Sequence, residues 1–218
     1  MALLLSFVFL SSSCSSEGVP EPEAHLCDVS EESAEGRLLS LILGTGQYKT
    51  TIFNDIRDVT ERLKVDLSQG VPKDGTAAVE ACSFLPNKSD DDGRVRVSFY
   101  WSGTQASVQT PPPSALRYGW NGTQVESTDS RSTIWTRCSM AGDAEESSRQ
   151  VWLTADASNT VDLGRKRNRV EQEQHASFLY LMTRRVTAPL GCTNDPLKGK
   201  PMMEPVDSSA SGSVKNGQ

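Results

Sequence analysis

The chain has 218 residues, a formal net charge of -6 and a pI of about 5.0. This negative charge disfavours nucleic acid and anionic membrane surfaces as partners of the molecule as a whole. Without its two polar ends the chain keeps roughly 170 residues, enough for one medium domain or two small subdomains with a hydrophobic core. It is therefore too large to be a miniature protein held together by disulfides alone.

The first residues have the pattern of an export signal. Ala2 to Leu10 form an apolar run broken only by Ser6, and three serines and Cys14 follow. The run is too short to span a bilayer, and the serines around Cys14 resemble the cleavage site of bacterial lipoproteins. We predict a signal peptide over residues 1–13 and a lipid on Cys14. An ordinary cleaved secretory signal and a chance apolar N-terminus are the alternatives.

Residues 14–24 are small, acidic and proline-containing, which predicts an extended, lipid-anchored tether that holds a domain away from a membrane. The folded part is expected to begin near His25. At the other end, residues 198–218 show no apolar periodicity and are predicted to be a disordered tail.

Cysteine parity supports the lipid assignment. The chain has five cysteines, and a lipid on Cys14 leaves an even set of four, Cys27, Cys82, Cys138 and Cys192. An even set in an exported chain predicts two disulfides in an oxidising compartment outside the cytoplasm.

In the first half, residues 25–110, we expect two helices and a strand. One helix begins after Asp28 or Ser30 and stops at Gly44. Apolar residues at helical spacing from Ile52 to Leu63 predict a second helix, with an ion pair between Asp58 and Arg62. Strict alternation over residues 95–101 predicts a strand with one buried face.

A triple proline, Pro111–Pro113, separates this half from the second, residues 114–197. Asn121-Gly122 predicts a hairpin between residues 117–120 and 123–126. Strands are expected over residues 134–138 and 151–155, and a long helix from Asn168 to Val186.

The two halves share a spacing that indicates an internal duplication. An acidic loop and then a strand follow both Cys82 and Cys138, at the same distances. Four cysteines allow three connectivities, and the one that fits two similar halves joins Cys27 to Cys82 and Cys138 to Cys192. The predicted fold class is α+β: two similar halves of antiparallel hairpins packed with helices, with two disulfides.

This layout resembles that of actinobacterial surface lipoproteins of unknown function. The resemblance rests on the lipobox-like start, the Pro/Glu tether, Cys27 opening a helix that ends in a Leu-Gly turn, and a later cysteine beside a strand. It covers most of residues 10–195 and includes no diagnostic catalytic motif. It implies a location at the cell surface and leaves the activity open.

No segment fits a familiar catalytic, cofactor or metal motif. Gly44 to Thr50 lacks the glycine that a phosphate-binding loop places before its lysine, so we interpret it as a helix end and a turn. Asp90–Asp92 does not fit the EF-hand register and is interpreted as a solvated hairpin loop. His175 is predicted to be a surface or boundary residue, not a general base. We therefore expect no catalytic residue, no metal and no cofactor.

Two sets of residues are candidates for binding a partner. The concentrated positive charge around the long helix could attract an envelope polymer or an acidic protein, and tryptophans on the outer face of strands could stack on sugar rings. Trp101 and Trp135 are expected in the core. The candidate binding residues are Arg165, Lys166, Arg167, Arg169, Arg184, Arg185, Trp120 and Trp152.

The sequence thus predicts an extracytoplasmic binding or interaction protein of the cell envelope, anchored to the cell membrane by its lipid. Its ligand is unknown, its partners are the membrane and an envelope polymer or protein, and nucleic acid is not among them. Secretion without an anchor is the alternative localisation. A cell-envelope hydrolase and a purely structural envelope lipoprotein are the alternative functions.

Overall fold

The computed structural model describes residues 26–87, 93–103, 115–120, 122–162, 164–199 and 201. Cys14, His25, Asp90–Asp92 and Pro111–Pro113 lie outside these ranges, as does the side chain of Trp120. The elements in chain order are α1 (Ala34–Leu43), β1 (Tyr48–Ile52), α2 (Ile56–Ser68), β2 (Val79–Pro86), β3 (Val95–Ser102), β4 (Leu116–Trp120), β5 (Thr123–Ser127), β6 (Arg131–Thr136), the 3₁₀ turn η1 (Gly142–Ala144), α3 (Glu145–Gln150), β7 (Trp152–Asn159) and α4 (Arg169–Leu190).

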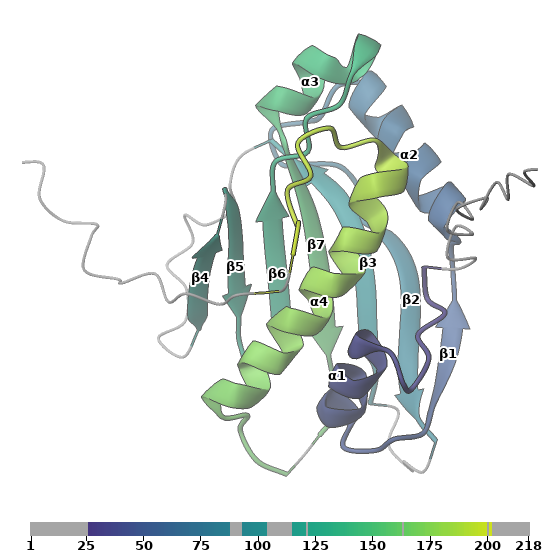
Figure 1. The fold of residues 1–218 in the computed structure, drawn as a ribbon, viewed down its shortest axis with the longest axis vertical. Helices are drawn as coiled ribbons and strands as arrows, with labels where there is room; N and C mark the ends of the chain where they lie inside the picture. The colour runs from purple at the N-terminus through teal and green to yellow at the C-terminus, as the bar shows by residue number, and fades with distance from the viewer. Residues whose placement is uncertain are drawn as a thin grey trace, which may run out of the picture.

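The seven strands that the structure describes form one antiparallel sheet in the order β1-β2-β3-β7-β6-β5-β4 (Figure 1). β1–β3 come from the first predicted half and β4–β7 from the second. The halves meet where β3 pairs with β7, from Val95 opposite Asn159 to Ser102 opposite Trp152. The predicted α+β class is confirmed, and both halves contribute to a single sheet.

Two strands, β2 and β1, lie beyond β3, and three strands, β6, β5 and β4, lie beyond β7. Cys82 lies in β2 beside β3, and Cys138 follows β6, which lies beside β7. The connections differ, because the segment after Cys138 forms η1 and α3. The prediction of an acidic loop in this segment is wrong. Glu145 and Glu146 instead occupy the first turn of α3, where the helix dipole favours acidic side chains.

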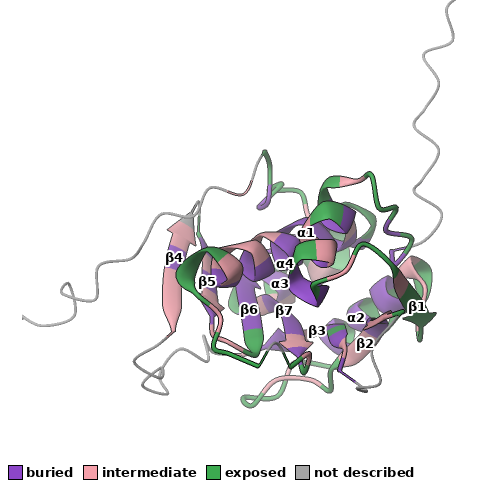
Figure 2. Cartoon of the chain, turned by 90° about the horizontal axis from the view of Figure 1, so that it is seen from below, coloured by how far each residue is buried: buried purple, intermediate pink, exposed green. Residues whose placement is uncertain are grey.

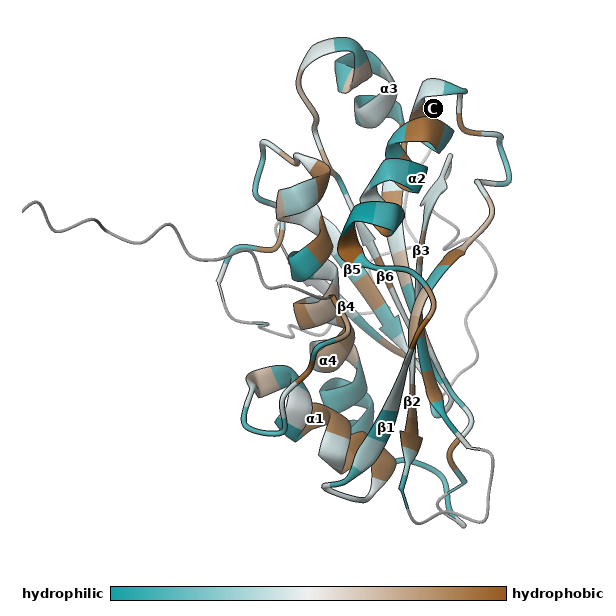
Figure 3. Cartoon of the chain, turned by 90° about the vertical axis from the view of Figure 1, so that its right-hand side faces the viewer, coloured by the Kyte–Doolittle hydropathy of each residue, from teal (hydrophilic) through white to brown (hydrophobic). Residues whose placement is uncertain are grey.

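α1, α2 and α4 lie on one face of the sheet (Figures 1 and 3). α4 contacts β5, β6 and β7, α2 contacts β2 and β3, and both α1 and α2 contact α4. The apolar side chains that β3 directs towards these helices, Val97, Phe99 and Trp101, are fully buried. Figure 2 shows buried residues, in purple, where the helices face the strands. The Trp101 indole also donates a hydrogen bond of 2.7 Å to the Leu63 carbonyl in α2. The core therefore lies between the sheet and the three helices.

Two helix ends follow the sequence closely. α1 ends at Gly44, whose positive φ of 68° suits glycine; this confirms the predicted helix end and turn. Asn168 caps α4, because its side chain accepts from the Glu171 backbone while the Glu171 carboxylate accepts from the Asn168 backbone. α4 continues past the predicted end at Val186 to Leu190, before Gly191 at φ 94°.

The second predicted helix begins too early. Ile52 is the last residue of β1, and α2 begins at Ile56 after the N-cap Asp55. The predicted ion pair is also wrong, because Arg62 pairs with Asp66 at 3.1 Å. The helical spacing of Ile56, Val59 and Leu63 was a correct signal, since Val59 and Leu63 are buried in α2. The spacing of Ile52 from Ile56 was a coincidence, because the Ile52 side chain is half exposed on the edge strand β1.

The predicted disulfide pairing is confirmed. Cys27 is bonded to Cys82 and Cys138 to Cys192, with sequence separations of 55 and 54 residues. The first bond ties the segment before α1 to β2, and the second ties the end of β6 to the end of α4. None of the described helices combines the length and apolarity needed to cross a membrane.

Candidate functional site

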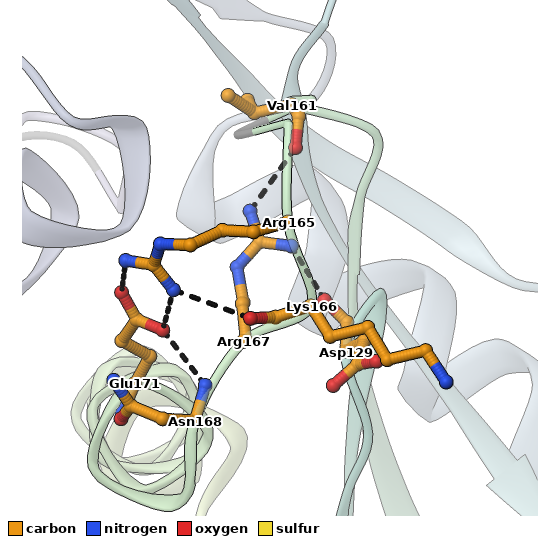
Figure 4. Close-up of polar contacts among 7 residues, drawn as sticks. All are labelled: Asp129, Val161, Arg165, Lys166, Arg167, Asn168 and Glu171. Atoms are coloured by element: carbon orange, nitrogen blue, oxygen red, sulfur yellow. Dashed lines mark hydrogen bonds and ion pairs between the residues drawn. The ribbon is translucent and has the colours of Figure 1, made fainter.

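Most of the predicted basic cluster is occupied in contacts within the protein. Arg165 donates two hydrogen bonds to the Glu171 carboxylate, at 2.8 and 2.5 Å (Figure 4). The hydrogen bond from Arg165, together with one from the Asn168 backbone, lowers the pKa of Glu171 to about 2. Arg169 is likewise paired, with Glu173 at 2.9 Å. The charges of Arg165 and Arg169 are therefore balanced by acidic residues at the start of α4.

Arg167 connects separate parts of the chain. Its guanidinium is half buried and donates to the carbonyls of Asp129, at 2.5 Å, and Val161, at 3.2 Å. It thus fixes the loop before α4 against the β5–β6 turn. Figure 4 shows the Lys166 side chain pointing away from these contacts, and Lys166 is the member of this loop that keeps its charge available within the described chain.

Arg184 and Arg185 lie at the other end of α4. Fifteen residues of helix separate Arg184 from Arg169, a distance of about 22 Å. Arg184 donates to the Gly199 carbonyl at 2.8 Å, and Arg185 forms a largely buried ion pair with Glu35 at 3.2 Å. The structure therefore divides the predicted basic cluster into two groups that cannot act on one small ligand.

His175 lies inside the core, so its predicted surface or boundary position is wrong. The side chain is fully buried, and neither ring nitrogen has a hydrogen-bond partner in the described chain. Burial, reinforced by the Arg167 charge, lowers its pKa to about 3. A general base must reach both a nucleophile and substrate, and the position of His175 meets neither condition.

The tryptophans divide between the faces of the sheet. Trp101 lies in the core between the sheet and the helices, as predicted. The core position predicted for Trp135 is wrong: its side chain is buried, but on the opposite face of the sheet and outside the core cluster. Trp152 is half buried and points away from Leu153, to the face without helices, as its alternation in the sequence predicts. Trp120 pairs with Thr123 at the end of β4, and its side chain lies outside the described part.

The face of the sheet opposite the helices, called the free face below, gathers polar and aromatic side chains. The pleat directs alternate residues of every strand to it, and no described helix covers it (Figure 3). Its members are Lys49, Thr51, Glu80, Ser83, Leu85, Arg96, Ser98, Tyr100, Ser102, Arg117, Gly119, Gln124, Glu126, Arg131, Thr133, Trp135, Trp152, Thr154, Asp156 and Ser158, together with Arg137 just after β6.

The charged groups of the free face are largely paired across strands. Arg131 donates to Asp156 at 2.5 Å, and Thr133 donates to the same carboxylate oxygen at 3.0 Å. Burial raises the pKa of Asp156 even so. Two further pairs, Arg96 with Glu80 at 3.6 Å and Arg117 with Glu126 at 3.5 Å, lie on neighbouring strands. The face is thus preorganised by cross-strand ion pairs.

Aromatic groups occupy another part of the free face. The Arg137 guanidinium lies 3.9 Å from the centre of the Trp152 ring, a cation–π contact, and donates to the carbonyls of Arg149 and Val151. Tyr100 pairs with Thr154, and Thr154 with Trp135, so the two aromatic residues flank a small one. Burial raises the pKa of Tyr100, with Asp156 adding to the effect.

Most ionisable groups of the free face are engaged by neighbouring side chains. Its carboxylate with a raised pKa, Asp156, is held by Arg131 and Thr133. Among the described residues, no three His, Cys, Asp or Glu side chains converge where they could share a metal ion. Sequence reasoning selected only Trp152 from this surface, although polar residues at every second position of residues 152–158 were a signal for an uncovered strand face.

No protein-family model, curated protein or solved structure matches this chain. Its function therefore has to be argued from its own site.

Proposed function

We propose that the protein is an extracytoplasmic binding protein of the cell envelope, anchored to the cell membrane by a lipid on Cys14, whose ligand binds to the free face. The observation that carries the proposal is a broad sheet face without a helical cover in the described chain, lined by aromatic rings and fixed ion pairs. Binding surfaces typically combine aromatic contact area with a few placed polar groups.

The location is supported separately. Two disulfides are typical of proteins that fold outside the reducing cytoplasm, and a lipid on Cys14 accounts for the fifth cysteine. A hydrolase receives less support, since His175 is enclosed in the core and Asp156 is engaged by two neighbours.

Two measurements test the proposal in a bacterial host that processes lipoproteins. Mass spectrometry of the mature N-terminus should find cleavage before Cys14 and the added mass of a diacylglyceryl group. An intact Met1 or an unmodified Cys14 would contradict the anchor.

Hydroxyl-radical footprinting tests the binding surface. Tyr100 and Trp152 should be modified less on intact cells than in the purified chain, because the ligand covers them. Phe53, which is half exposed beside the edge strand β1, is the matched control and should be modified equally in both samples. Equal modification of Tyr100 and Trp152 in the two samples would show that the free face is unoccupied on cells.

A further inference from the structure

Two side-chain nitrogens on the free face are buried and have no hydrogen-bond partner in the described chain: Trp135 Nε1 and Arg117 Nη2. Trp135 as a whole is only 7% exposed. Buried donors in proteins almost always have an acceptor, because leaving one unpaired costs free energy. Both groups are donors that cannot accept, so a partner for them supplies acceptor oxygen atoms. The free face also has two buried oxygens without a hydrogen-bond partner in the described chain, Glu80 Oε1 and Ser83 Oγ, and these lie on β2, away from Trp135 and Arg117.

The register of the sheet brings these two donors near one another. Trp135 in β6 pairs with Gln124 in β5, which pairs with Gly119 in β4. Arg117 is two residues before Gly119 and on the same face of β4. Standard strand dimensions place the Cα atoms of Trp135 and Arg117 about 12 Å apart, with Gly119 contributing no side chain. A disaccharide can bridge that span when both long side chains reach towards it.

The charge of the free face differs from that of the molecule. The chain as a whole is negative, with a formal charge of -6. On the free face the basic side chains outnumber the acidic ones, so the face is net positive and complementary to an anion. The basic members are Lys49, Arg96, Arg117, Arg131 and Arg137, and the acidic members are Glu80, Glu126 and Asp156.

The aromatic residues favour a ligand with flat apolar faces. Tyr100 and Trp152 are each half buried on the same surface as the two unpaired donors. A sugar ring offers an apolar C–H face for stacking on an aromatic ring and hydroxyl groups at its rim for polar contacts.

We infer that the free face binds an acidic saccharide, a sugar chain bearing carboxylates or phosphates. Trp135 Nε1 and Arg117 Nη2 are covered in the ligand-free chain, and side-chain movement on binding exposes them so that they donate to its oxygen atoms. This inference rests on the proposed function, because it names the ligand class for the same surface.

The test measures binding of the full chain, purified in detergent, to four probes by calorimetry. They are an oligogalacturonate, a phosphorylated oligosaccharide, a neutral dextran oligomer and an oligoglutamate of equal charge. One or both acidic saccharides should bind at least tenfold more tightly than dextran and oligoglutamate, and the tighter of the two identifies the anion. Equal affinity for dextran would overturn the acidic requirement, and equal affinity for oligoglutamate would overturn the saccharide.

Two variants test the named donors. Trp135→Phe keeps an aromatic ring and removes Nε1, and Arg117→Gln removes Nη2. Each should weaken binding of the acidic saccharide by at least about tenfold, the usual effect of losing a hydrogen bond to a charged group. Arg62→Gln is the matched control, because it removes one positive charge from α2 on the other side of the sheet. An equal loss in Arg62→Gln would mean that net charge alone governs binding.

Thermal unfolding of each variant separates lost contacts from lost folding. Arg117 is partly exposed and its ion pair with Glu126 is long, so Arg117→Gln keeps a stable fold and carries the test by itself if Trp135→Phe does not fold. A footprint on Tyr100 and Trp152 on cells without binding of either acidic saccharide would overturn this inference and leave the proposed function standing.

Discussion

Alternate residues of β3 separate the two faces of the sheet. Val97 and Phe99 are fully buried under the helices, whereas Arg96 and Tyr100 point to the free face, one exposed and one half buried. The covered face is held together mainly by apolar contact, while the free face is ordered by ion pairs such as Arg131 with Asp156. One strand thus contributes to the core through one set of residues and to the proposed binding surface through the other.

Each face also holds a residue that does not fit its surroundings. His175 is a polar ring with unpaired nitrogens in the apolar core, and Trp135 is a buried indole with an unpaired donor on the polar face. The two residues have different consequences because they lie on opposite sides of the sheet. His175 is enclosed in the core and lowers stability, whereas Trp135 lies on the sheet face that no described helix covers, where we propose that a ligand binds.

Two neighbouring residues of β3, Phe99 and Tyr100, test whether the two faces contribute unequally to stability. We expect Phe99→Ala to lower the free energy of unfolding by about 4 kcal/mol, because it leaves a cavity under the helices. Tyr100→Ala should cost only about 1 kcal/mol, since its ring is partly solvated and no helix packs on it. Denaturant unfolding of both variants is the measurement. Similar losses would show that the free face carries as much of the stability as the covered one.

The disulfides provide a second comparison, between the two halves. Cys27→Ser with Cys82→Ser should cost about 3 kcal/mol, since the unfolded chain loses a cross-link that closes a long loop. The Cys138 and Cys192 pair closes a loop of nearly equal length, 54 against 55 residues, and should cost about the same. Chemical denaturation of both double variants tests this. A loss confined to one of them would show that the halves are stabilised by different means.

Lowering the pH should reveal how much the buried His175 reduces the free energy of unfolding. Its pKa is about 3 in the folded protein and about 6.5 in an unfolded chain. Between these values the unfolded chain binds a proton that the folded one does not, so stability is fully present above pH 7 and falls as the pH decreases. The loss between pH 7 and pH 5 should be about 2 kcal/mol.

His175→Leu fills a similar volume without a titratable group. Its free energy of unfolding should change much less between pH 7 and pH 5, and that difference from the parent chain is the measurement. The same fall in both proteins would assign the acid sensitivity to other groups.

The sequence predicted best what depends on neighbours in the chain. The stop of α1 at Gly44 and the capped start of α4 at Asn168 follow from local backbone chemistry. The disulfide pairing was accessible too, because the two halves repeat the same cysteine spacing. Alternation in the strands was sufficient to place Trp152 opposite Leu153.

What the sequence could not supply depends on which strands pair. Arg131 meets Asp156, and Arg117 meets Glu126, through register across separate strands. Nothing local indicates these contacts, so the free face was missed except for Trp152. His175 was misplaced for a related reason: its neighbours Glu171 and Gln172 make that part of the helix look exposed, while packing of α4 on β5–β7 buries it.

The smallest effects concern the loop before α4, and they decide whether the basic cluster is structural. Asn168→Ala removes the cap of α4 and should cost about 1 kcal/mol. Arg165→Gln removes an exposed ion pair with Glu171 and a hydrogen bond to the Lys166 carbonyl, and it should cost less than that. Thermal unfolding measures both.

Lys166→Gln provides the final comparison with the free face. Lys166 is exposed, and its side chain points away from the Arg165 and Arg167 contacts in Figure 4. This side chain forms no hydrogen bond or ion pair within the described chain, so its loss should leave the unfolding temperature unchanged. If the free face is the binding surface, protection of Tyr100 and Trp152 on cells should also be unchanged. Weaker protection of Tyr100 and Trp152 in Lys166→Gln, with an unchanged unfolding temperature, would contradict the free face as the binding surface. It would show that the ligand binds at the start of α4 through the unpaired charge of Lys166.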